Sequence, residues 1–431
     1  MSPPTSPRTA ADPATAARHG WPQALGTVLA GLIAMGVVAS LGLWAAGATD
    51  LGGDAFPRIV SATVVTSVGG AVELSGDAGG IVGTEASLTV IPLSVTLAGA
   101  LVVAWGFLRP LHHRAVAGSA ELADWAGRIA VLWLAALLGL AFAARQTFQV
   151  PLEEGGPDDL GDLFGIEPTV GFTTDVPLTV LFGLLWLAGV LALALLVPHG
   201  APLPGRLLQL ETPLRPAAYT MVLLLLAYVV IGVVVGLVVA GTEGHPAETF
   251  AVMLLGLPNL VWLSLTIGMG ATWDGRVEGP FGLPMPHILD EVLRGQEVSA
   301  LNLGTLSEHD GRVWWLLVVD VVLLLAAGCV MAARTPARLP PWRHAVHMAV
   351  ALALTVLMIC LVGRVTAHYG LSVLGIGDLG GGLSGDVFLR PRLWGAVGLA
   401  VAWGLVTGFL GALLARWLVR RGRGVVGYGS E

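Results

Sequence analysis

Long apolar runs, separated by short polar segments, recur along almost the whole chain. A helix needs about 20 apolar residues to cross the hydrocarbon core of a bilayer, and eight runs come up to that length. We therefore predict an all-α fold, a polytopic bundle of transmembrane helices, with spans at residues 24–46, 88–108, 126–144, 177–197, 217–240, 313–333, 345–363 and 393–417.

A ninth apolar segment, residues 249–272, decides the topology because Pro258 and Asn259 lie in its middle. Proline removes one helical hydrogen bond and clashes with the preceding turn. We expect this segment to break into two half-helices that enter the membrane and return to the same side. A full crossing is the alternative, and it would reverse the side on which every later loop lies.

The distribution of arginine favours the re-entrant arrangement. All 22 basic residues are Arg, against 29 acidic residues. Loops rich in Arg stay in the cytoplasm. With eight spans and a re-entrant segment, all the Arg-rich segments lie on one side, so we predict a multi-pass plasma-membrane protein with both termini cytoplasmic. Fourteen of the Arg, but only five of the acidic residues, lie in these segments: 1–23, 109–128, 199–215, 334–344 and 416–431.

The composition indicates that the lipid bilayer is the main partner. Hydrophobic residues make up 55% of the chain and charged residues 12%, about half the charged share of soluble proteins. Nothing indicates nucleic-acid binding, and the lack of a P-loop, nucleophile-elbow or zinc-protease motif argues against an enzyme. We expect no catalytic, cofactor or metal site. Cys329 and Cys360 lie in separate apolar runs near opposite membrane faces, so we expect no disulfide.

The two halves of the chain follow the same plan, which predicts a duplication. At an offset of 219 residues, span 126–144 aligns with 345–363 and Arg145 aligns with Arg364. Four spans per half is an even number, so we expect parallel repeats related by an axis along the membrane normal. The predicted parts are a tail at 1–23, repeats at 24–198 and 216–419, an external re-entrant and amphipathic insertion at 249–312, and a cytoplasmic tail at 420–431.

Small residues form a ridge on the opening span of each repeat, and such ridges let helix backbones approach closely. The ridges are Gly26, Ala30, Ala34 and Gly232, Gly236, Ala240. The first-half counterpart of 249–272 is 56–72. Its Val, Thr and Gly residues fit a re-entrant helix and an external β-hairpin equally well.

Three residues are candidates for a function within the membrane: Asp320, Arg145 and Arg364. Asp320 is the only acid well inside a span, where a carboxylate marks a pathway or an ion pair, or fixes helix packing. The two Arg end equivalent spans, where they either line a vestibule or extend to water. Turn 334–344 is short, so the spans beside it should be antiparallel neighbours. We predict that Asp320 pairs with Arg364.

Several segments resemble the streptophobe family of actinobacterial integral membrane proteins. They include HGWPQALGTVLAGLIAMGVVASLGLWAAGATDL near the start, LTVIPLSVTLAGALVVAWGFLRPL, GRVEGPFGLPMPH, and HYGLSVLGIGDLGGGLSG near the end. The resemblance covers nearly the whole chain after the tail. It implies a plasma-membrane protein of an actinobacterium, and it assigns no activity and no site residue.

Two classes of function compete. A transporter or channel-like protein for an unidentified substrate is indicated by the repeat, the interrupted segment and Asp320. The alternative is a non-transporting envelope scaffold or partner of other membrane proteins. A third class, an intramembrane enzyme acting on lipid, lacks an acid–base or metal cluster. A polar cavity reaching Asp320 would favour transport, whereas a closed bundle with an external cap would favour the scaffold.

Overall fold

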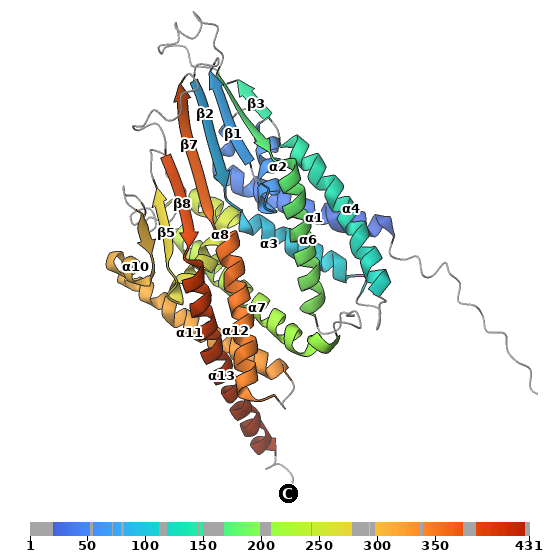
Figure 1. Cartoon of the computed structure of the whole chain (residues 1–431), viewed down its shortest axis with the longest axis vertical. Coiled ribbons are helices and arrows are strands. Elements are labelled where there is room, and N and C mark those ends of the chain that lie inside the picture. The colour runs from blue at the N-terminus through green and yellow to red at the C-terminus, as the bar shows by residue number, and fades with distance from the viewer. Residues whose placement is uncertain are drawn as a thin grey trace, which may run out of the picture.

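The computed structural model describes residues 20–51, 55–70, 72–78, 82–111, 119–144, 146–149, 168–198, 208–242, 244–277, 293, 298–335, 339–373 and 385–426. This part of the chain is a bundle of helices with an eight-stranded antiparallel sheet at one end (Figure 1). The predicted polytopic helix bundle is confirmed, whereas the sheet was not predicted. We call the two ends of the bundle the sheet end and the far end.

The long helices have the apolar length of transmembrane segments. Eight contain a stretch long and apolar enough to cross a membrane, and α3, with 16 residues, is apolar but shorter. The protein is therefore a multi-pass membrane protein. The long helices are α1 (Trp21–Ala45), α3 (Leu93–Leu108), α4 (Ser119–Ala143), α6 (Val176–Leu196), α7 (Leu208–Thr242), α8 (Pro246–Gly268), α11 (Trp315–Arg334), α12 (Pro341–Val362) and α13 (Leu393–Val426); short ones are η2 (Ala48–Leu51), α2 (Ala55–Ser67), α10 (Leu303–His309) and η4 (Gly311–Trp314).

Exposed tryptophans mark both ends of the bundle. Trp44, Trp314, Trp315 and Trp394 lie on helix ends next to the sheet, and Trp21, Trp105, Trp342 and Trp417 lie toward the far end. In α1 and in α13 the two levels are 23 residues apart, or about 35 Å along a helix. That length matches a hydrocarbon core of about 30 Å with its interfaces, where Trp gathers.

The sheet joins strands from both halves of the chain. Its order is β3-β4-β1-β2-β7-β8-β5-β6, so each half contributes four strands in the same sequence, and β2 pairs with β7 at the join. Most of the segment 56–72 lies in a helix, α2 (Ala55–Ser67), and its last residue, Val72, begins the hairpin β1–β2. The strands are β1 (Val72–Ala78), β2 (Val82–Thr89), β3 (Gln146–Gln149), β4 (Pro168–Thr174), β5 (Trp273–Val277), β6 (Ser299–Leu301), β7 (Val365–Val373) and β8 (Gly385–Pro391).

Eight of the long helices connect the sheet end to the far end. Helices α3, α6 and α13 follow a strand directly and α11 follows β6 through α10, whereas α4 and α12 lead into one; α1 and α7 approach the sheet through α2 and α8. The predicted span 88–108 is therefore α3, whose shorter helix begins at the base of β2. Helix α8 is the ninth long helix, although its length and apolar composition also suit a span.

Helix α8 runs along the base of the sheet. In its middle, the Asn259 side chain contacts Ile91 and Leu93, at the junction of β2 and α3. At its end, Gly268 is followed by four residues and then by β5, which begins at Trp273. The middle and the end of α8 therefore both lie near the sheet end, and whether this helix crosses the membrane or returns stays a prediction.

The predicted break at Pro258 is wrong, because α8 is continuous. The Ser94 hydroxyl bridges two backbone groups that would bond to each other in a regular helix. It accepts a hydrogen bond from Leu257 N (3.2 Å) and donates one to Met253 O (2.8 Å). A side chain inserted into the helical ladder satisfies groups that the proline separates. The helix therefore tolerates Pro258.

Only one of the two predicted glycine ridges makes a close helix contact. A Cβ on Gly232 or Gly236 would clash with Val261 or Met253 of α8, so these glycines permit that packing. Gly26 on α1 has nothing within 4 Å of an added Cβ. The opening helix α1 instead packs on α3 through Gly31, one and a half turns further along.

Candidate functional site

Asp320 lies where α7, α8 and α11 meet, and its side chain is 1% exposed. Tyr228 Oη of α7 donates a hydrogen bond to Asp320 Oδ1. Asp320 Oδ2 lies against Gly268 of α8, where an added Cβ would clash with it. This oxygen has no hydrogen-bond partner among the described residues. The carboxyl group is thus enclosed by packing.

The predicted pair between Asp320 and Arg364 is wrong. Arg364 is exposed at the junction of α12 and β7, and no ion pair between described residues joins it to Asp320. The reason is that α13 packs between α11 and α12. Gly404 and Gly408 of α13 lie on the α12 backbone, and Gly411 lies on the α11 backbone at Gly328. Arg145 lies outside the described residues.

A cavity of about 550 Å³ lies between α8 and the base of the sheet. Its walls come from both halves of the chain: the ends of α1, α2 and α12, the start of α3, and strands β5, β7 and β8. The described lining is mainly aliphatic and aromatic. Polar lining residues are few: Thr63, Thr66, Glu248 and Asn259.

Strand β5 forms the wall of this cavity on the sheet side, because every second residue of the strand is buried. Trp273, Gly275 and Val277 are buried, and Trp273 and Val277 line the cavity. A Cβ on Gly275 would lie 2.6 Å from Leu293 Cδ2, so glycine makes room for the Leu293 side chain. Leu293 belongs to the predicted amphipathic insertion, of which it is the only described residue between 278 and 297, and it is 2% exposed.

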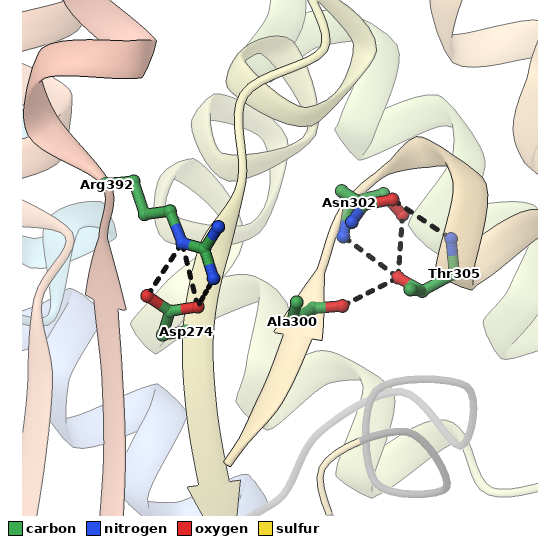
Figure 2. Close-up of polar contacts among 5 residues, drawn as sticks. All are labelled: Asp274, Ala300, Asn302, Thr305 and Arg392. Atoms are coloured by element: carbon green, nitrogen blue, oxygen red, sulfur yellow. Dashed lines mark hydrogen bonds and ion pairs between the residues drawn. The ribbon is translucent and has the colours of Figure 1, made fainter.

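Polar contacts fix the strands and loops around this wall of the cavity (Figure 2). Arg392, at the start of α13, binds Asp274 of β5 with both Nε and Nη2 at 2.9–3.1 Å. After β6, Asn302 Oδ1 accepts from Thr305 N, and Thr305 Oγ1 accepts from Asn302 N and donates to Ala300 O. These contacts hold β5 to α13 and β6 to α10.

The floor of the cavity is anchored by Asn259. Its Oδ1 accepts from Leu93 N (3.1 Å) and its Nδ2 donates to Ile91 O (2.9 Å). Both polar atoms of this side chain are therefore engaged with the β2–α3 junction. Asn259 positions α8 under the sheet, and the cavity that remains above the helix is apolar.

The helices and tryptophan levels define the class of this protein, a multi-pass helical membrane protein whose sheet lies beyond the spans. Comparison with protein-family models, with curated proteins and with solved structures gives no match. The resemblance to the streptophobe family therefore rests on the quoted segments alone.

Proposed function

We propose that the protein is a non-transporting membrane protein that binds an apolar chain, such as the hydrocarbon tail of an amphiphile, between α8 and the sheet. The observation that carries this proposal is the cavity itself. Its volume of about 550 Å³ lies within the range of about 300–1,000 Å³ of small-molecule sites, which are mostly apolar with few polar groups.

The position of the cavity supports a ligand from the membrane. The cavity lies at the sheet end, between α8 and the base of the strands, and Leu43 beside the exposed Trp44 is one of its lining residues. Trp gathers where hydrocarbon meets the headgroups, so an acyl chain is available at this level. We further propose that this face is external and that both termini are cytoplasmic, on the strength of the Arg distribution.

Transport is the second candidate, and Asp320 is the observation that favours it, since a buried carboxylate in a span often marks a pathway. The surroundings of Asp320 argue for a packing role instead. Tyr228 and Gly268 pack against it, and it lines neither this cavity nor the opening between α1 and α3 near Gln23 and Arg109.

Photo-crosslinking tests the cavity. The purified protein in lipid nanodiscs is irradiated with a fatty acid that carries a diazirine in its chain, and adducts are mapped by mass spectrometry. We expect adducts on α8 and β8. Replacing Gly256 by Leu should reduce them about tenfold, because this glycine lines the cavity and has space for a side chain, the nearest atom being Asn259 Oδ1 at 3.9 Å from an added Cβ.

The matched control is Gly36→Leu, on α1, where nothing lies within 4 Å of an added Cβ and neither cavity is lined. This variant should keep the cavity adducts. Adducts that survive Gly256→Leu, or that occur only on lipid-facing positions of α7 such as Val230 and Val234, would contradict the proposal.

A further inference from the structure

We propose a second binding site, at the far end of the bundle: a groove between α1 and α3 that holds an anionic phospholipid. The groove has a volume of about 590 Å³. Gly26 and Ala30 of α1 and Gly106 of α3 line its walls, and Gln23 and Arg109 lie toward the far end. This site does not depend on the cavity under the sheet.

The shape of the groove follows from the packing of α1 on α3. Contact is close where Gly106 meets Thr27 and where Gly31 meets Val103. Gly26, one residue before Thr27 on α1, faces open space, which is why the predicted ridge made no helix contact there. The opening extends from Gln23 to Ala30, about 10 Å along the helix, so the part of an acyl chain next to the headgroup can lie in it.

The charge at the mouth selects the headgroup. Arg109 is exposed, and its guanidinium carbon lies 5.2 Å from the centre of the Trp105 ring, which is itself exposed at the far-end tryptophan level. Lipid phosphates lie at this level, and Arg binds phosphate through charge-assisted hydrogen bonds. Asp124, beside the groove residue Trp125, pairs with Arg128 at 2.5 Å. Arg109 is thus placed to attract an anion.

Lipid-dependent thermal unfolding tests the groove. The full-length protein in detergent is titrated with phosphatidylglycerol, with phosphatidylcholine of the same acyl chains, and with inorganic phosphate. A ligand that binds the folded state raises Tm with concentration. We expect phosphatidylglycerol to bind about tenfold more tightly than phosphatidylcholine, because both carry the phosphate but the choline cation of phosphatidylcholine offsets the negative charge that Arg109 attracts. Phosphate alone should give no shift.

Two variants and their controls distinguish binding of the lipid's acyl chain from binding of its headgroup. Arg109→Gln should abolish the preference for phosphatidylglycerol, and Gly26→Leu should remove stabilisation by both lipids. Arg343 is a matched control, because it lies over Trp342 at the same 5.2 Å but does not line the groove. Gly36→Leu controls for a bulky residue on α1.

The proposal fails if the two lipids stabilise equally, or if phosphate reproduces the shift. It also fails if Arg343→Gln removes as much of the preference as Arg109→Gln, because the effect would then belong to any arginine at the membrane interface.

Discussion

At the scale of single residues, the buried carboxyl of Asp320 is the clearest case of a correct location with an incorrect partner. Its burial within a span was predicted from the apolar sequence around it. The partner depends on which helices are neighbours, and α13 separates α11 from α12. One signal could have identified the donor: Tyr228 is the only one of the four Tyr that lies in the middle of a predicted span.

The hydrogen bond between Tyr228 and Asp320 should stabilise the fold. Tyr228→Phe leaves a buried carboxyl without its donor, and we expect a loss of about 1–3 kcal/mol. In a thermal-unfolding cycle, Tyr228→Phe and Asp320→Asn should be non-additive. Asp320→Asn and Arg364→Gln should simply add, because these two residues do not interact. Strong coupling between Asp320→Asn and Arg364→Gln, with none between Tyr228→Phe and Asp320→Asn, would restore the Asp320–Arg364 pair predicted from the sequence.

At the scale of elements, the helices were more predictable than their contacts. Hydrophobic length is a local property, and it located the spans to within several residues. Whether Pro258 breaks α8 is decided by Ser94, which lies 163 residues from its bonded partner Leu257. The break was predicted from residues 249–272 alone, and Ser94 lies outside that segment.

Removing the Ser94 hydroxyl tests this account of α8. Ser94→Ala leaves Leu257 N and Met253 O without their bridge, so we expect a loss of about 1–2 kcal/mol in unfolding free energy. Adding Pro258→Ala should recover part of this loss, since the regular ladder can then close. Ser264→Ala is the control, because that hydroxyl bonds only to Leu260 within α8. Equal effects of Ser94→Ala and Ser264→Ala would show that the bridge contributes nothing.

At the scale of the whole molecule, the strand order bears on the predicted duplication. A two-fold axis would place equivalent strands symmetrically about the join. Instead β2 pairs with β7, the counterpart of β3, so the two halves follow one another head to tail. From this order we infer a duplication without two-fold symmetry. The pairing of 82–89 with 366–373 is far apart in sequence, and no local pattern indicates it.

Cysteine labelling in intact cells tests the orientation. Single cysteines are placed at Glu308 and Arg343, both exposed, in a chain whose Cys329 and Cys360 are replaced by Ala. We expect a membrane-impermeant maleimide to label position 308, at the sheet end, from outside. Position 343 should react only after permeabilisation, because arginine-rich turns remain in the cytoplasm. The reverse pattern would mean either that α8 crosses the membrane or that the whole chain is inverted, and each would overturn the proposed topology; external labelling of both positions would show that α11 does not cross.

The head-to-tail order also bears on filament growth. A head-to-tail arrangement does not close into a ring, so another copy of the chain that paired at an outer edge of the sheet would extend it. The inner join is long, with eight residue pairs between β2 and β7. Within the described residues, the two edge strands are shorter: β6 has three residues and β3 has four. Short edge strands offer few unpaired backbone groups, which is one way that sheets avoid edge-to-edge polymerisation. The short edge strands β3 and β6 therefore disfavour the addition of further strands to the sheet beyond the four from each half of the chain.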